Sequence, residues 1–313
     1  MDADHIRDKP HVSIFIPVKD GAKTVGLLMD AIFAQMTDLS YEVVLIDSGS
    51  TDGTLDILRK YPVRLYEIRP QDFNHGSTRN QGIAHCRGDL VINIVQDAIP
   101  ADRLWLDKMV RNFSDESVAG VFCRQIPWDH HDIFTKRQLN IWTGPEREIK
   151  CITDRDKYDK MKPVDKFRFC AFDNVCSCLR KEVWEKYKFE ETEFAEDLIW
   201  GKKILENGFK IVYEPATAVI HSHDRSLWSE YKRNHITHQR LSELFGLASM
   251  PTRSVFLETL WWVLRDDLGY ALKSQERFSK KIRTLAKASV RSPVLLYAQY
   301  RGARSKQAMT GKS

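Results

Sequence analysis

Residues 41–53, Tyr-Glu-Val-Val-Leu-Ile-Asp-Ser-Gly-Ser-Thr-Asp-Gly, lead from an apolar run into a turn rich in glycine and serine. The run from Tyr41 to Ile46 has the aliphatic, β-branched composition of a buried strand, and it ends at Asp47. Asp52 then stands where its side chain can cap a helix that runs through Arg59. The stretch is therefore predicted to fold as a strand, a turn and a helix.

The same order of elements continues on both sides of this stretch. Strands are predicted at residues 12–18, 63–68 and 90–95, and helices at residues 24–35 and 77–86. Strands that alternate with single helices at this spacing imply right-handed crossovers. We therefore predict an α/β fold with a mostly parallel sheet and helices on both of its faces.

The second half of the chain has a weaker pattern. Residues 122–168 lack a regular period and are rich in Trp, Arg, His and Asp, so we expect an irregular segment that faces the substrate. Further strands are predicted at residues 174–179, 210–213 and 218–220, and further helices at residues 181–187 and 195–207. The predicted division of the chain is an N-terminal arm, an α/β catalytic domain and a basic helical C-terminal region, at residues 1–10, 11–225 and 226–313.

The basic residues gather at the C-terminal end. The whole chain has a net charge of +5, but residues from Pro251 onward hold 13 Lys or Arg against 4 Asp or Glu, so the rest of the chain sums to −4. A basic end with apolar residues at helical spacing predicts attraction to anionic membrane lipid and no nucleic-acid partner. The alternative is a helical region that packs on the catalytic domain or joins two copies into a homo-oligomer.

Apolar runs and the start of the chain bear on its location. No uncharged apolar run approaches the roughly 18 residues that cross a bilayer. The first residues, Met-Asp-Ala-Asp-His, are polar and acidic and lack the features of a signal peptide. We therefore expect a cytoplasmic protein, at the inner face of the cell membrane if its basic end binds lipid.

Two polar clusters near the first strands favour a phosphorylated ligand. Asp47 ends a buried strand, where its carboxylate either caps the following turn or accepts a hydrogen bond from a nucleobase or a ribose hydroxyl. The turn is not the Gly-x-Gly-x-x-Gly of nicotinamide-binding folds. Arg79 lies in residues 75–80, His-Gly-Ser-Thr-Arg-Asn, near a predicted helix N-terminus that favours an anion. Its guanidinium either binds a phosphate or pairs with a surface acid.

A metal site is predicted around Asp97, which follows the strand at residues 90–95. One carboxylate holds Mg²⁺ or Mn²⁺ when waters and substrate diphosphate oxygens complete the coordination shell. His221 and His223 follow the apolar residues 218–220, and either can supply an imidazole, which favours Mn²⁺. The alternative for the two histidines is a solvated loop.

An acid pair, Glu196 and Asp197, stands at the start of a predicted helix, where the helix dipole alone also favours acids. Apolar residues, among them Trp200, flank the pair. Burial would raise the pKa of a carboxyl group there, which suits a general base that takes a proton from a sugar hydroxyl. We assign the base to Asp197, acceptor binding or orientation to Glu196, and the acceptor side to Trp200.

Taken in order, these motifs resemble the inverting family 2 glycosyltransferases of the GT-A fold, over residues 11–225. The bacterial rhamnosyltransferase branch is the more similar, on the motifs Phe-Asn-His-Gly-Ser-Thr-Arg-Asn (73–80), Gln-Asp-Ala-Ile-Pro (96–100), Arg-Gln-Ile-Pro (124–127), Glu-Asp (196–197) and His-Ser-His (221–223). The resemblance implies transfer of a sugar, rhamnose in this branch, from a nucleotide-diphosphate sugar to an acceptor hydroxyl with inversion. It also implies a divalent cation on the diphosphate.

The resemblance further implies roles for single residues. The donor site would comprise Pro17, Val18, Asp20, Asp47, Arg79, Gln96 and Asp97. Asp97 would also bind the metal, Asp197 would be the base, and Gln125 and Asn174 would lie near the sugars. The acceptor would be a cell-envelope glycan or its lipid-linked precursor.

Two other functions stay open. A sugar-phosphate nucleotidyltransferase has a related sheet but carries a Gly-rich, basic loop after its first strand, which residues 19–23, Lys-Asp-Gly-Ala-Lys, match poorly. The other is a non-catalytic protein that binds nucleotide sugars or membranes. It stays open because Asp97 is a single acid, and one carboxylate alone is a poor site for a divalent cation. The released product separates the three functions. A glycosyltransferase releases nucleoside diphosphate, a nucleotidyltransferase releases pyrophosphate, and a non-catalytic binding protein releases neither.

Overall fold

The computed structural model describes residues 9–192, 194–223, 225–275 and 277–305. Residues 1–8 of the predicted N-terminal arm lie outside the described residues. The chain divides into two compact units. The first holds the described residues up to Trp128 together with Leu139–Tyr158 and Cys170–Ser222, and the second holds Asp129–Gln138, Asp159–Phe169 and the described residues from His223 onward.

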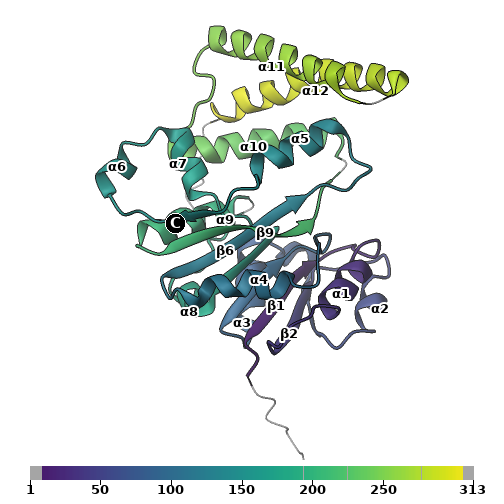
Figure 1. Ribbon diagram of the computed structural model, residues 1–313, viewed down its shortest axis with the longest axis vertical. Helices are drawn as coiled ribbons and strands as arrows, with labels where there is room; N and C mark the ends of the chain where they lie inside the picture. Colours follow the sequence, from purple (N-terminus) through teal and green to yellow (C-terminus); the bar gives the residue numbers. More distant parts are fainter. Residues whose placement is uncertain (1–8, 193, 224, 276, 306–313) are drawn as a thin grey trace, which may run out of the picture. The chain divides into compact units, whose positions relative to one another are not determined.

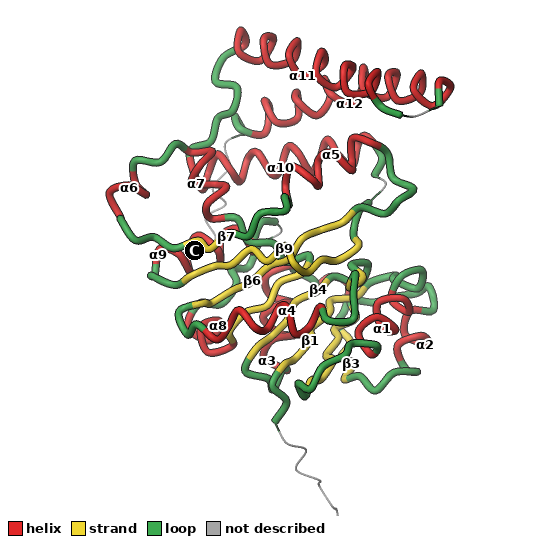
Figure 2. Tube along the Cα trace, in the orientation of Figure 1, coloured by secondary structure: helices red, strands yellow, loops and turns green. Residues whose placement is uncertain are grey.

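The first unit is built on one sheet, which has nine strands among the described residues (Figure 2). Its strand order is β3-β2-β1-β4-β8-β6-β9-β5, and β7 pairs with β9. In chain order the strands are β1 (Val12–Val18), β2 (Tyr41–Asp47), β3 (Arg64–Glu67), β4 (Leu90–Ile94), β5 (Ile99–Pro100), β6 (Val118–Ile126), β7 (Glu148–Lys150), β8 (Cys176–Arg180) and β9 (Lys210–Ile220). The helices of this unit include α1 (Val25–Phe33), α2 (Thr54–Leu58), α3 (His75–His85), α4 (Trp105–Val110), α6 (Arg155–Asp159), α8 (Lys181–Lys186) and α9 (Glu196–Glu206), with 3₁₀ turns at Pro70–Asp72 and Arg111–Ser114.

Strand β1 shows why helices cover both faces of the sheet. Ile14 and Ile16 point to one face, where they belong to the same buried cluster as Leu28 of α1. Phe15 points to the other face and meets Gly82 of α3, where an added Cβ would come within 1.9 Å of the Phe15 ring. Only glycine lets α3 approach β1 this closely. The predicted α/β fold class is confirmed.

The sheet contains both parallel and antiparallel strand pairs, and their directions determine which strand ends lie along the same edge of the sheet. Strands β1, β2, β3 and β4 pair in parallel, and β6 pairs in parallel with β9. Strand β8 runs antiparallel to both β4 and β6. The carboxyl ends of β1, β2, β4, β6 and β9 therefore lie along one edge, and the beginning of β8 lies at that same edge.

Two parts of the sheet differ from the predicted elements. Strand β6 begins at Val118 and pairs with β8 and β9, although residues from Phe122 were expected to be irregular. Strand β9 continues through Pro215, where two separate strands were expected. Its register with β6 jumps from Glu214 to Ala218, so Pro215 lies in a bulge where its missing N–H interrupts no ladder bond.

The second unit is helical. It contains α7 (Pro163–Cys170) for the most part, α10 (Leu227–Phe245), α11 (Arg253–Lys273), α12 (Phe278–Gly302) and the first part of α5 (Ile133–Trp142). Helices α11 and α12 lie side by side (Figure 1), and α12 also packs on α10. Arg291 of α12 forms a bidentate ion pair with Glu230 of α10, with both N···O distances 2.8 Å. Among the described residues, no helix is both long enough and apolar enough to traverse a bilayer.

Candidate active site

The predicted metal ligands come together at the edge where the strands end. Asp97 follows β4, and His221 directly follows β9. Ligand atoms of Asp97, His221 and His223 all lie within 4.8 Å of one another. His221 Nε2 is 3.7 Å from Asp97 Oδ1, and the His221 side chain is 9% exposed. An acid and two imidazoles at this spacing suit a divalent cation.

Gln125, at the end of β6, orients the first of these imidazoles. The Gln125 amide nitrogen donates to Asp173 Oδ2 at 2.6 Å, because an ionised carboxylate only accepts. The Gln125 Oε1 atom therefore faces His221 Nδ1, at 2.8 Å, and accepts a hydrogen bond from its N–H group. With the proton fixed on Nδ1, the lone pair of His221 is on Nε2, the nitrogen that faces Asp97. This tautomer is the one that can bind a metal through Nε2.

Asp173 was not identified from the sequence. Its Oδ2 also accepts from Trp142 Nε1 at 3.1 Å, and its Oδ1 accepts from the backbone N–H of Val175 at 2.9 Å. The residue lies just before β8, and a strand that runs antiparallel brings its beginning, not its end, to the edge of the site. A search of residues that precede strands, as well as those that follow them, would have found it.

The acid pair opens α9, as the sequence predicted. The residue before it, Ala195, has a left-handed φ of 67°, which is uncommon for a non-glycine residue. Glu196 is 5% exposed and forms an ion pair with Arg79, with Nη1 3.0 Å from Oε1. The Asn174 amide nitrogen also donates to Glu196 Oε1, at 3.3 Å. Arg79 thus pairs with an acid that is buried, whereas the sequence offered a phosphate or a surface acid.

Asp197 keeps part of its surface accessible while its carboxylate accepts two backbone hydrogen bonds, from Leu198 N at 2.7 Å and from Asn174 N at 3.2 Å. Its pKa is raised to about 8, first by desolvation and then by the nearby charges of Glu196 and Asp173. The backbone bond from Asn174 and the positive charge of Arg79 act in the opposite direction. A carboxyl group with this pKa, on a residue that is partly exposed, can exchange a proton near neutral pH.

At the end of β2, the Asp47 carboxylate is engaged by its own turn. It accepts from the backbone N–H groups of Gly49 and Ser50 at 2.8 and 2.9 Å, and from the Ser50 hydroxyl. The side chain is buried, with 1% exposed. These contacts are those of a turn cap, the first of the two roles that the sequence left open for Asp47.

The loop after β1 is held by the other predicted donor residues. The amide of Gln96 accepts from Lys19 N and donates to Lys19 O, both at 2.8 Å. A Cβ on Gly21 would come within 2.7 Å of Gln96 Oε1, so this contact needs glycine. Asp20 is exposed and accepts from Thr51 N at 2.8 Å. Gln96 therefore fixes the shape of the loop that carries Asp20.

The remaining predicted residues divide between the edge of the site and the core. Pro17 is half-buried, and Val18 is a core residue with 2% exposed whose carbonyl accepts from Ser48 N. Trp200 is 1% exposed and donates its indole N–H to Tyr187 O at 2.7 Å. The acceptor-side role given to Trp200 is therefore corrected, because a side chain enclosed in the core cannot touch an acceptor.

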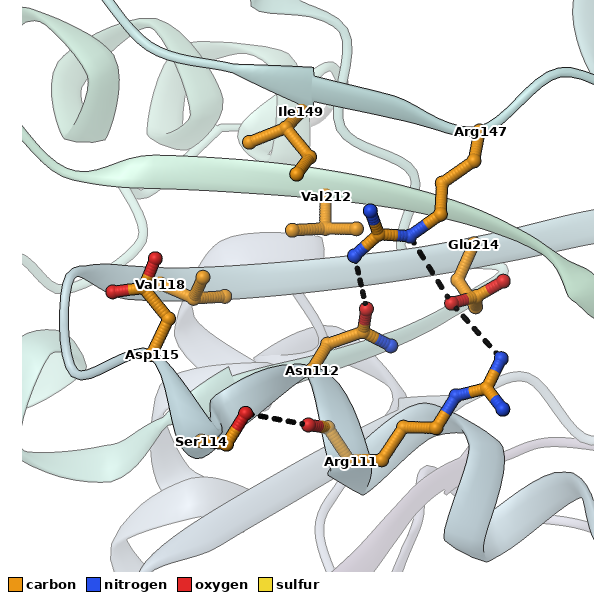
Figure 3. A pocket seen from close by; sticks show the side chains of 9 residues that line it. All are labelled: Arg111, Asn112, Ser114, Asp115, Val118, Arg147, Ile149, Val212 and Glu214. Atoms are coloured by element: carbon orange, nitrogen blue, oxygen red, sulfur yellow. Dashed lines mark hydrogen bonds and ion pairs between the residues drawn. The ribbon is translucent and has the colours of Figure 1, made fainter.

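A cavity of about 460 Å³ lies elsewhere in the first unit (Figure 3). Glu214, buried with 2% exposed, faces it together with Arg111 and Arg147, whose nitrogens are 3.3 and 3.4 Å from Glu214 Oε2. The lining residues are Arg111, Asn112, Ser114, Asp115, Val118, Arg147, Ile149, Val212 and Glu214. None of the predicted site residues lines this cavity, and its two arginines share a counter-charge within the protein.

The fold has a known architecture. An α/β sheet of this strand order, with carboxylates gathered where its strands end, has the GT-A architecture seen in solved glycosyltransferase structures. The chain belongs to Glycosyl transferase family 2, whose family model matches residues 13–187. The predicted family is thereby confirmed.

Similar proteins include two bacterial rhamnosyltransferases. The chain is 32% identical over 206 residues to the O-antigen chain rhamnosyltransferase WbaN of Salmonella anatum, covering 64% of this chain and 62% of that protein. It is 29% identical over 226 residues to the O-antigen chain rhamnosyltransferase RfbN of Salmonella typhimurium, covering 71% and 69%. Among solved structures, the mannosyltransferase PcManGT of Pyrobaculum calidifontis, in complex with GDP-Man and Mn²⁺, has a TM-score of 0.55 at 17% identity, covering 95% of this chain and 74% of that one.

Proposed function

We propose that the chain transfers a sugar from a nucleotide-diphosphate sugar to an acceptor hydroxyl with inversion, and that this sugar is rhamnose. The observation that carries the proposal is Asp197, a partly exposed residue at the N-terminus of α9 whose pKa is raised to about 8 by desolvation and by the nearby charges of Glu196 and Asp173. Membership of family 2 and the two rhamnosyltransferase relatives support the reaction class and the donor sugar.

The chemistry needs one proton acceptor and one departing group. The acceptor hydroxyl oxygen attacks the anomeric carbon from the face opposite the diphosphate, and the bond from that carbon to the diphosphate oxygen breaks. The diphosphate leaves with the electron pair, and the hydroxyl proton passes to the carboxylate of Asp197. The ion pair of Glu196 with Arg79 and the hydrogen bonds from Asn174 hold the start of α9 in place.

The residues at the ends of β4 and β9 fit a divalent cation. Asp97 and His221 would hold Mn²⁺ or Mg²⁺, with His223 as a further ligand, and Gln125 fixes the tautomer that binding requires. A cation bound there neutralises negative charge that develops on the diphosphate. Asp20 and Pro17 lie at the edge of the same sheet, and we propose that they contact the nucleoside.

The acceptor and the location are part of the proposal. A cell-envelope glycan, or its lipid-linked precursor at the cytoplasmic face of the membrane, suits the O-antigen names of the relatives. The basic helical end of the chain would then meet either the lipid surface or a second copy of the chain.

Donor turnover tests the reaction. Nucleoside-diphosphate rhamnose, Mn²⁺ and the purified chain are expected to release nucleoside diphosphate slowly, and faster when a rhamnose acceptor is added, because water is then replaced by a bound hydroxyl. Anion-exchange chromatography measures the nucleotide, and product NMR gives the anomeric configuration. Release of pyrophosphate would indicate nucleotidyl transfer, and absence of turnover with a panel of nucleotide sugars would indicate a binding protein.

Cation affinity tests the role of Gln125. Replacement of Gln125 by leucine removes the acceptor for His221 Nδ1–H, so the affinity for Mn²⁺ is expected to fall about 10–100-fold in calorimetric titrations. Asp97→Ala is the reference for loss of a ligand and is expected to weaken binding at least as much. Asn112→Leu removes another buried amide, one that lines the separate cavity and bonds to Lys108 O and Arg147, and serves as the matched control. Unchanged affinity in Gln125→Leu would show that His221 needs no such orientation.

A further inference from the structure

The connection between α11 and α12 exposes apolar and basic side chains together. Leu272 is 60% exposed, Phe278 is 80% exposed and Ile282 is 52% exposed. In the sequence, residues 272–283 hold five basic residues and one acid, a net charge of +4. We call the described residues of this segment the hairpin tip; its basic members are Lys273, Arg277, Lys280, Lys281 and Arg283.

These apolar side chains lie outside the packed interior of the helical unit. The inward face of α12 is marked by Thr284, Ala288 and Ser292, which are buried at helical spacing. Phe278 and Ile282 lie one turn apart on α12 and remain outside this buried stripe. Groups of large, solvent-exposed apolar side chains are a feature of surfaces that bind a partner.

The hairpin tip is also ordered within the fold. The Lys281 ammonium donates to the Leu272 backbone carbonyl at 3.0 Å, which ties the beginning of α12 to the end of α11. The Ser274 hydroxyl donates to Ala271 O at 2.8 Å and closes the last turn of α11. The apolar and basic groups are therefore held together, so little ordering is needed when they bind.

The chemistry of the hairpin tip selects one kind of partner. Its apolar side chains need a medium that replaces water, and its cations need anions beside that medium. The interface of a bilayer with anionic lipids offers both, with the acyl boundary next to the headgroup phosphates. We propose that the hairpin tip inserts into a membrane surface that contains anionic lipid. This goes beyond the sugar transfer proposed above and does not depend on it.

Vesicle co-sedimentation of the full chain without donor tests the proposal. The wild type is expected to bind vesicles of phosphatidylcholine mixed with phosphatidylglycerol, and to bind vesicles of phosphatidylcholine alone much more weakly. Binding should fall as salt is added, because salt screens the exposed charges. Lys280→Glu with Arg283→Glu should lower partitioning at least about tenfold, since each basic residue near such a surface contributes about fivefold.

A second variant separates insertion from charge attraction alone. Phe278→Ser with Ile282→Ser keeps the charge and is expected to lower partitioning by about tenfold or more, because apolar burial drives insertion. Leu27→Ser, on α1 where Leu27 is 53% exposed, is the matched control and should bind as the wild type does. Circular dichroism of each variant confirms that the helices are formed.

Three outcomes would overturn the proposal. The first is equal partitioning of the wild type and both hairpin-tip variants, and the second is no binding of the wild type to either kind of vesicle. The third is self-association of the wild type in ultracentrifugation that the same variants abolish, which would make the hairpin tip a contact between copies. Donor turnover with a soluble acceptor is expected to be the same in all variants, so a failure here is distinct from a failure of the proposed reaction.

Discussion

Replacing Asp197 by asparagine is expected to lower the rate of sugar transfer about 10²–10⁴-fold, the range that a positioned general base contributes. The amide has nearly the same shape, but it cannot take the proton of the acceptor hydroxyl. Donor affinity, measured by calorimetry with Mn²⁺ present, should stay within a few-fold of the wild type. Near-normal transfer in Asp197→Asn would remove this residue from the role of base.

The pH dependence of the same reaction gives a second, independent readout. A base must be ionised, so kcat/KM of the wild type is expected to rise with pH and to level off above an apparent pKa of about 8. Residual activity of Asp197→Asn should lack this rise. Asp56→Asn makes the same change in the first turn of α2 and should keep both the rate and the pH profile of the wild type.

Much of the fold could be predicted because the first two strands, β1 and β2, are buried on both faces over most of their length. The apolar run Val12–Val18 has the β-branched composition of a buried strand, and β1 spans those residues. Strand β6 was missed in part because it lies among polar and aromatic residues whose burial comes from distant segments. Phe122 is buried against Phe172 and Tyr213, contacts that no local pattern contains.

The candidate site was predictable as a set of residues but not as a network. Asp97 and His221 follow strands, so their meeting follows from the parallel order of β4, β6 and β9 through the sheet. The position of Asp173 depends on the antiparallel direction of β8, which the sequence does not reveal. Nor could the sequence show that Arg79 faces Glu196, because that ion pair joins α3 to α9. Side-chain partners across elements are set by packing rather than by local pattern.

Replacing Glu196 by glutamine is expected to destabilise the fold by about 3–5 kcal/mol, because it leaves the guanidinium of Arg79 buried without its counter-charge. The Arg79 side chain is 7% exposed, so water cannot replace the lost partner. Urea denaturation followed by circular dichroism measures the change in the free energy of unfolding. The substitution also removes a negative charge that raises the pKa of Asp197, so the rise of kcat/KM with pH should move below pH 8.

The double variant Arg79→Gln with Glu196→Gln distinguishes a lost ion pair from a general defect at the start of α9. It leaves no uncompensated charge in the pair, so it should be more stable than either single variant. If the two single effects instead add in the double variant, the residues do not interact and the account of the pair is wrong. Donor affinity then shows whether Arg79 also contacts the diphosphate. Glu196→Gln keeps the Arg79 guanidinium, and the double variant removes it. The double variant should therefore bind donor more weakly than Glu196→Gln only if Arg79 contacts the diphosphate.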